Sequence, residues 1–239
     1  MGSGEAIYVD SVRRRRDLSV LILLDVSGSA GEPGAAGGGT GTSVHDHQVR
    51  AAAGLTTALH DLGDRVALYG FRSLGRHAVQ VLPVKRFGDG LDATVLRRLG
   101  GLVPGAYTRL GAAIRHGASV LESGGGTSRR LLVVLSDVFA DDHGYDGAYG
   151  EADARRALAE ARRRGTACLC LSVAAATDAR ALRRVFGTAA HASVPHAQQL
   201  AATVGPLFRA ALQLAEVQRR TAQRRQRTRV RSEIERRTA

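Results

Sequence analysis

Two short segments of this 239-residue chain are apolar at almost every position. They read LSVLILL from Leu18 and LLVVL from Leu131. A strand that is apolar on both faces must be covered on both faces, which is typical of the central strands of a parallel sheet. These two runs restrict the possible folds more than any other feature of the sequence.

Further β-like runs alternate along the chain with longer segments of helical periodicity. This order predicts an α/β fold, namely a doubly wound, mostly parallel central sheet of about six strands with helices on both faces. The run at 78–83 ends in Pro83, which favours the edge of the sheet and suits an antiparallel strand. We expect strands at 19–24, 65–71, 78–83, 130–135, 167–173 and 192–195, and helices at 49–62, 92–99, 110–121, 151–164, 179–186 and from about 197 past 214.

The length of the chain suits one sizeable domain with tails. We expect a basic lead-in at 1–17, the domain at 18–217 and an Arg-rich tail at 218–239. No apolar stretch approaches the roughly 20 residues that span a bilayer, and no signal-peptide pattern opens the sequence. We therefore expect a cytoplasmic protein that does not insert into a membrane.

The only two cysteines, Cys168 and Cys170, lie two positions apart in an apolar run. In a strand this spacing places both side chains on one face. The pattern favours reduced core residues over a redox or metal-binding pair.

The formal net charge of +12 lies mostly at the two ends of the chain. Residues 219–239 hold nine arginines and two glutamates, and residues 13–16 are four further arginines. Aromatic residues on which bases could stack are scarce, since the chain has five Phe, five Tyr and no Trp. A solvated helix end or a partner-docking segment is favoured for the tail, and nucleic-acid binding through it is the alternative.

Oxygen-bearing side chains follow both apolar runs. Asp25, Ser27 and Ser29 form a D-x-S-x-S at the carboxyl end of an expected strand, where open α/β sheets bind ligands. Thr108 precedes an expected helix, and Asp137 follows the second apolar run. Carboxylate and hydroxyl oxygens are the hard donors that Mg²⁺ prefers. We expect these five residues to form a Mg²⁺ site, with Mn²⁺ or Ca²⁺ as alternatives, although D-x-S-x-S alone could be an ordinary helix cap.

Together these motifs resemble the von Willebrand factor A domain with its metal-ion-dependent adhesion site. In that family the equivalent five side chains hold Mg²⁺ directly or through water, and an acidic side chain of a protein partner often completes the coordination. The resemblance assigns these roles to the five residues named above. One departure is Val138, where many members have glycine.

A second stretch, SDVFADDHGYDGAYGEADAR from Ser136, resembles one bacterial branch of that family. This branch contains the NorD-type proteins, described as nitric oxide reductase activation proteins, and relatives associated with cobalt chelatase and with Rubisco activation. The segment TRLGAAIRH from Thr108 is also similar to this branch. The resemblance implies an adaptor that works with a MoxR-type AAA+ ATPase on a client metalloenzyme such as nitric oxide reductase.

Four residues of this stretch are candidate partner-binding positions: Tyr145, Tyr149, Asp153 and Arg155. The local alternative is that Asp153 lies in a first helical turn, where the helix dipole favours a negative charge, and that the two tyrosines hold a loop. The sequence does not decide between the two interpretations.

Other classes of protein fit the sequence less well. A hydrolytic site would draw on His45, Asp46, His47 and His143, which lie in polar segments expected to form solvated loops. A nucleotide-binding fold would present glycine and backbone N–H groups where this chain has Asp25, and no phosphate-binding G-x-x-x-x-G-K-[ST] occurs. We expect a protein-binding module rather than an enzyme, with a stand-alone binding protein of another pathway as the alternative within the family.

Overall fold

The structure is a computed structural model, and it describes residues 17–31, 42–137, 142–145, 147–173, 175, 179–194, 199, 202–214, 216–217 and 220. The predicted lead-in, apart from Asp17, and the predicted Arg-rich tail, apart from Arg220, lie outside this part of the chain.

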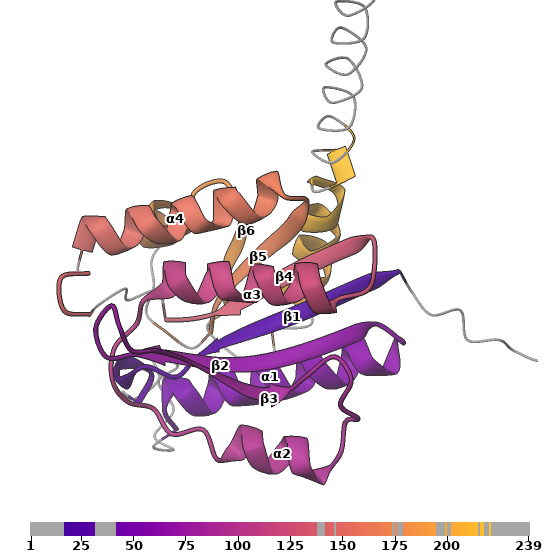
Figure 1. Cartoon of the computed structure of the whole chain (residues 1–239), viewed down its shortest axis with the longest axis horizontal. Helices are drawn as coiled ribbons and strands as arrows, with labels where there is room; N and C mark the ends of the chain where they lie inside the picture. Colours follow the sequence, from indigo (N-terminus) through magenta and orange to yellow (C-terminus); the bar gives the residue numbers. More distant parts are fainter. Residues whose placement is uncertain are drawn as a thin grey trace, which may run out of the picture.

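Six strands form one sheet in the order β3-β2-β1-β4-β5-β6, as Figure 1 shows in part. Every neighbouring pair is parallel except β2 and β3. The two fully apolar runs are β1 and β4, which lie side by side in the middle of the sheet. The predicted fold class is confirmed. The strands are β1 (Leu18–Asp25), β2 (Arg65–Ser73), β3 (Val79–Lys85), β4 (Arg129–Leu135), β5 (Thr166–Val173) and β6 (Ala190–Val194).

Strand β3 is the antiparallel edge strand that Pro83 suggested, but it does not end there. Pro83 pairs with Tyr69 at a point where the register of the two strands shifts. An edge strand can accommodate a proline because one of its two sides needs no ladder hydrogen bonds. The strand therefore continues to Lys85, whose buried ammonium group donates to the backbone oxygens of Val66 and Asp89.

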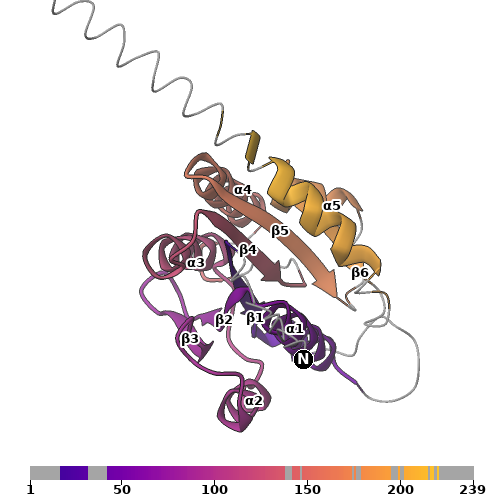
Figure 2. The ribbon, with the colours of Figure 1, turned by 90° about the vertical axis from the view of Figure 1, so that its right-hand side faces the viewer.

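The helices cover both faces of the sheet, as Figure 2 shows from the side. Helices α1 and α2 and the helical residues 202–214 pack on one face, and α3, α4 and α5 pack on the other. Within the described ranges, no helix is long and apolar enough to cross a bilayer. The helices are α1 (Val44–Asp61), α2 (Ala93–Gly100), α3 (Leu110–Gly124), α4 (Gly147–Arg163) and α5 (Ala179–Phe186), with a short 3-10 helix, η1 (Gly28–Gly31).

Helix α1 begins five residues earlier than predicted. Ser43 caps it by accepting from the backbone N–H of Asp46, and the Asp46 side chain accepts in return from the N–H of Ser43. This reciprocal capping box is a known start signal, and the sequence analysis overlooked it. His45 and His47 therefore lie in the first turns of a helix and not in a solvated loop, and His45 is buried.

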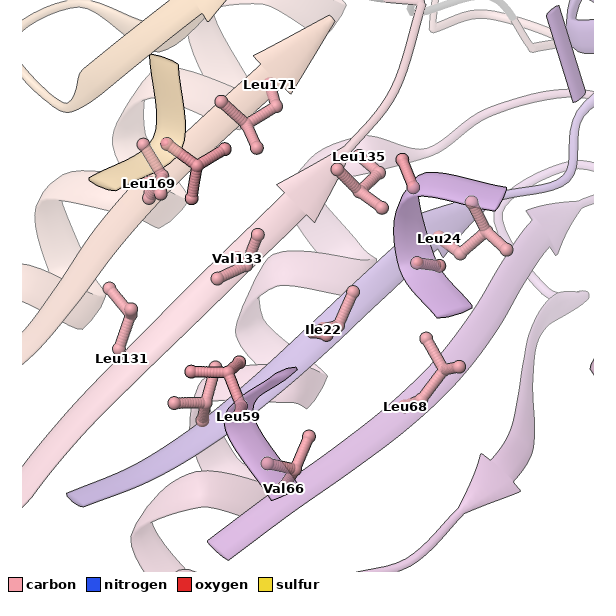
Figure 3. Packing of buried hydrophobic residues seen from close by; sticks show 14 of the residues in the cluster. Ile22, Leu24, Leu59, Val66, Leu68, Leu131, Val133, Leu135, Leu169 and Leu171 are labelled. Carbon is pink, nitrogen blue, oxygen red and sulfur yellow. The ribbon is translucent and has the colours of Figure 1, made fainter. Parts of the chain in front are cut away.

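The core lies on both faces of β1, because alternate residues of a strand point to opposite faces. Figure 3 shows the cluster to which Ile22 and Leu24 contribute, with Leu59 of α1 packed on it. On the opposite face, Cys168 and Cys170 are free thiols packed with α3, α4 and α5. Burial raises the pKa of Cys168 to about 12 and that of Cys170 well above its usual value, so both thiols stay protonated. The prediction of reduced core cysteines is confirmed.

Helix α3 approaches the sheet most closely at Gly117. A Cβ atom at this position would lie 2.9 Å from a methyl carbon of Leu23, 3.1 Å from one of Leu132 and 3.2 Å from one of Leu21. All three leucines are fully buried, so their methyl groups cannot move into solvent. The glycine therefore sets how near this helix lies to the central strands.

We expect Gly117→Ala to destabilise the fold by about 1–3 kcal/mol through overpacking, despite the better helix propensity of alanine. Gly54→Ala in α1 is the matched control, since a Cβ there meets no atom within 4 Å. The control should stabilise by roughly 0.5–1 kcal/mol. Urea denaturation of both variants measures the two effects, and equal stabilities for the two variants would contradict the close packing of α3.

Candidate metal centre

Asp25 is the last residue of β1, and its carboxylate is fully buried at the carboxyl edge of the sheet. One carboxylate oxygen accepts from the backbone N–H of Ser27 at 3.0 Å and from the hydroxyl of Thr108 at 3.1 Å. The other accepts from the hydroxyl of Ser136 at 2.8 Å. Three separate loops therefore meet at this one carboxylate.

The serines of the D-x-S-x-S motif lie together just beyond Asp25. Their hydroxyl oxygens, Ser27 Oγ and Ser29 Oγ, are 3.1 Å apart. Ser29 lies in the short helix η1, which turns the chain away from β1 directly after the motif. The first loop thus brings both hydroxyls to the end of the central strand, as the sequence predicted.

Backbone hydrogen bonds hold the second loop, which carries Thr108, against the first. The N–H of Gly28 donates to the oxygen of Ala106, and the N–H of Gly105 donates to the oxygen of Val26, both at 3.0 Å. A Cβ atom on Gly28 would lie only 3.1 Å from the Ala106 oxygen, so the close approach favours glycine. Ala106 itself adopts a left-handed φ of +63°, which is strained for alanine and persists only where the surroundings fix the backbone.

Asp137 lies beyond the end of β4, in the third loop, and is buried. Burial and, next to it, the negative charge of Asp137 raise the pKa of Asp25 to about 7, against the opposing effect of the hydrogen bonds from Ser136 and Ser27. Two neighbouring buried carboxylates repel each other, and a divalent cation between them would relieve that repulsion.

The donor set suits a hard divalent cation. It consists of two carboxylates and three hydroxyls, all oxygen ligands of the kind that Mg²⁺ and Mn²⁺ accept. Among the residues that the structure describes, no group of three or more His, Cys, Asp or Glu is placed to hold a metal. The candidate site combines its two carboxylates with serine and threonine hydroxyls. Val138 lies outside the described residues.

Two contributors to this region were missed from the sequence. Ser136 supplies a hydrogen bond to Asp25, although it had been noted only as the residue before Asp137. Asp142 is also buried, and its carboxylate forms a 2.8 Å ion pair with Arg109, the residue after Thr108. The position of Arg109 directly after the predicted ligand Thr108 was a signal that it could matter for the site. Nothing in the sequence indicated that Asp142 is its partner.

The four candidate partner-binding residues have different surroundings. Tyr145 is buried, and its hydroxyl donates to Asp153 at 2.7 Å and accepts from the N–H of Gly111 at 3.1 Å. Tyr149 is 63% exposed and packs its ring edge-on against Tyr145, whereas Arg155 is exposed on α4. As the chain is folded, Tyr149 and Arg155 could contact a partner directly, while Tyr145 acts within the chain.

Asp153 lies in the second turn of α4, because that helix begins at Gly147 and not near residue 151. The interpretation that placed it in a first turn is wrong. Its carboxylate instead accepts from Arg115 of α3 at 2.7 Å and from Tyr145. Burial alone would raise its pKa, but the hydrogen bonds from Arg115 and Tyr145 outweigh burial and lower it, so the group stays ionised.

Two of the histidines considered for a hydrolytic site, His45 and His143, make contacts within the fold. His45 Nε2 lies 2.9 Å from the backbone oxygen of Leu102. The ring of His143 packs edge-on against Tyr107 at a centroid distance of 5.0 Å. These contacts give both rings a role in packing the loops.

A family model described as the von Willebrand factor type A domain matches residues 20–140. An uncharacterized protein of Pseudomonas aeruginosa is 38% identical over 214 residues, which cover 85% of this chain and 32% of that protein. Protein NorD of Stutzerimonas stutzeri is 33% identical over 176 residues, which cover 70% of this chain and 27% of NorD. The chain thus spans roughly a third or less of the length of these relatives.

Among solved structures, the manganese-loaded TRAP protein of Plasmodium vivax is similar with a TM-score of 0.56. The likeness covers 80% of this chain and 72% of that one at 14% sequence identity. At this identity the comparison concerns the fold alone.

The buried carboxylate of Asp25 predicts how stability depends on pH when a chelator removes divalent cations. The folded chain keeps the Asp25 proton up to about pH 7, whereas the unfolded chain releases it near 3.8. Between these values the folded state holds more protons, so this group makes stability fall as pH rises. In the unmodified chain the free energy of unfolding should therefore fall between pH 5 and 7.5, and we expect Asp25→Asn to make that fall smaller by on the order of 2 kcal/mol.

Thermal and urea denaturation in EDTA at several pH values measures this slope. Asp61→Asn is the control, because Asp61 is an exposed carboxyl at the far end of α1. The control should keep the slope of the unmodified chain. Identical slopes for the chain and its Asp25→Asn variant would mean that Asp25 is already ionised in the fold.

Proposed function

The chain belongs to the von Willebrand factor type A domain family, in its NorD-like branch, and on this premise we propose that it is a metal-dependent protein-binding module rather than an enzyme. The observation that supports the proposal most directly is the meeting of three loops at Asp25. These loops bring the predicted ligands to one edge of the sheet. The carboxylate of Asp25 accepts a hydrogen bond from Thr108, and its pKa is raised by burial and by the negative charge of Asp137.

We propose Mg²⁺ as the resident ion, held by Asp25, Ser27, Ser29, Thr108 and Asp137. When bound, the ion would neutralise the two buried carboxylates and supply a Lewis-acidic position for a partner's carboxylate. Manganese and calcium are the alternative ions, and one protein of the same fold is described as manganese-loaded.

The surface beside the ligand loops indicates the chemistry of the partner. Residues 72–77 and 103–109 are joined by paired backbone hydrogen bonds between Ser73 and Tyr107. These segments contain no acidic residue, and two of their arginines, Arg72 and Arg76, are at least partly exposed, whereas Arg109 is paired with Asp142. Leu74 and Val103 are exposed to solvent, 57% and 68% respectively. A basic surface with exposed apolar side chains next to a cation suits a partner segment that combines an acidic residue with apolar neighbours.

The NorD name of several relatives leads us to propose an adaptor role. In this role the domain would link a MoxR-type AAA+ ATPase to a client metalloenzyme of the nitric oxide reductase kind during its activation. The chain covers only part of those relatives, so the proposal concerns the binding step that this domain would contribute.

The chemistry around the site supports binding over catalysis. The Asp25 carboxylate, whose pKa is raised to about 7, is fully buried and already accepts from a backbone N–H and two hydroxyls. A general base must reach the proton that it removes, and this carboxylate is directed into the protein. A cation-held contact with a partner requires no such proton transfer.

The first test is calorimetric titration of Mg²⁺ into the metal-free chain and its Asp25→Ala variant. Saturation at about 100 times Kd should stabilise the unmodified chain by about 2.7 kcal/mol, and the variant should show neither heat nor stabilisation. Asp61→Ala serves as the control and should bind like the unmodified chain. An unmodified chain that ignores Mg²⁺ and Mn²⁺ at millimolar concentrations would rule out the metal-dependent mechanism.

A second test concerns the docking surface. We expect Leu74→Glu to weaken binding of the purified MoxR-type ATPase, or of its client, from the same organism by about tenfold or more, because it adds an acid where an acidic partner would dock. Mg²⁺ affinity should not change. Leu62→Glu is the matched control, since Leu62 is equally exposed but follows α1 at the opposite edge of the sheet. Equal loss of binding in both variants would argue against a docking surface at residues 72–77.

A further inference from the structure

Asp142 is a buried carboxylate that accepts four hydrogen bonds, and it lies outside the predicted ligand set. One oxygen accepts from the Ser73 hydroxyl at 2.9 Å and from Arg109 Nε at 2.8 Å. The other accepts from the N–H groups of Gly75 at 2.8 Å and of His143 at 2.7 Å. We call Asp142 and these four donors the Asp142 clasp.

The clasp joins three segments that are far apart in the sequence. Ser73 and Gly75 come from the end of β2 and the turn after it, and Arg109 precedes the first residue of α3. Asp142 itself belongs to the connection that leads from Asp137 to α4. The clasp therefore links the loop of Thr108 to the connection that follows Asp137.

Arg109 is fixed from several sides. Besides its ion pair with Asp142, its terminal nitrogen donates to the backbone oxygen of His143 at 2.6 Å. Its guanidinium also lies over the ring of Tyr145, 4.8 Å from the centroid. An arginine with these partners cannot shift without breaking several bonds, and Thr108 is its neighbour in the chain.

Helix α3 has no capping side chain of its own, because Arg109 at its N-cap makes no capping hydrogen bond. The start of the helix is instead held by the clasp and by Tyr145, whose hydroxyl accepts from the N–H of Gly111. A Cβ atom on Gly111 would lie 2.1 Å from a carboxylate oxygen of Asp153, so glycine is required for this close approach. The position of Thr108 thus depends on contacts made by the connection after β4.

The charge of Asp142 is stabilised where it lies. Burial would raise its pKa, but the hydrogen bonds from Ser73, Gly75, Arg109 and His143 outweigh burial and lower it. The ion pair is therefore present throughout the neutral pH range, and the clasp is a constant feature of the fold.

We propose that Asp142 is a positioning residue for the metal centre, which holds the loop of Thr108 in place through its ion pair with Arg109. The inference rests on the proposed metal-binding function. Partners that orient metal ligands from outside the coordination sphere commonly change metal affinity by about 10- to 100-fold when they are altered. Loss of the clasp should therefore weaken Mg²⁺ binding although no ligand has been removed.

The test is calorimetric titration of Mg²⁺ into Asp142→Asn, which keeps the shape of the side chain and removes its charge. We expect Kd to rise by about 10- to 100-fold. Leu59→Ala is the control for general destabilisation, because Leu59 lies near the end of α1 in the core cluster on the opposite face of the sheet from α3, and its variant should retain the unmodified Kd. If Asp142→Asn does not fold, Ser73→Ala removes one donor, keeps the ion pair and should raise Kd by about threefold.

Arg109→Gln and the double variant complete the experiment. If both residues act through one ion pair, the double variant should bind Mg²⁺ no more weakly than Asp142→Asn alone. The positioning role would be overturned if the single variants bound Mg²⁺ as tightly as the unmodified chain. It would also be overturned if the losses of binding free energy in the two single variants simply added in the double variant. In both cases the unmodified chain still binds Mg²⁺. An unmodified chain without Mg²⁺ affinity would instead overturn the proposed function itself.

Discussion

The buried carboxylate of Asp25 is the interaction on which the rest of this structure depends. Asp25 is the last residue of a central strand that is apolar on both faces, so a carboxyl group is buried at the edge of the core where the chain turns. A buried carboxylate is costly unless donors surround it. The three loops at this edge supply those donors, from Ser27, Thr108 and Ser136. The arrangement of the loops follows from this requirement.

Two kinds of bond hold the loops in place. Backbone hydrogen bonds join the first loop to the second, at Gly28 and Ala106 and at Gly105 and Val26. Side-chain bonds around Asp142 join the second loop to the connection after β4. Backbone pairing is insensitive to side-chain identity except where it needs glycine, whereas the ion pair depends on two particular residues. Metal affinity in this domain should therefore vary with residues that touch no metal.

The connection after β4 links the candidate metal centre to the outer helices. Tyr145 contacts Arg109 with its ring and Gly111 and Asp153 with its hydroxyl, and Asp153 in turn binds Arg115. The tyrosines of this stretch have different surroundings, since Tyr145 is internal while Tyr149 is exposed. A partner that binds at Tyr149 would contact a residue packed on the same network that holds the start of α3.

The sequence by itself determined the sheet, because runs apolar on both faces can only be central strands, and it determined that oxygen donors follow those strands. Parallel strands place their carboxyl ends at one edge, so Asp25 after β1 and Asp137 after β4 could be expected to lie near each other without knowledge of the packing, whereas Thr108 follows no parallel strand. The helix starts at Val44 and Gly147 were missed, although Ser43 and Asp46 carried a readable signal. Only the tertiary structure decided that Asp142 pairs with Arg109 and that Tyr145 bonds to Gly111. Those contacts join residues about 33 positions apart through side-chain geometry, which neither periodicity nor local propensity encodes.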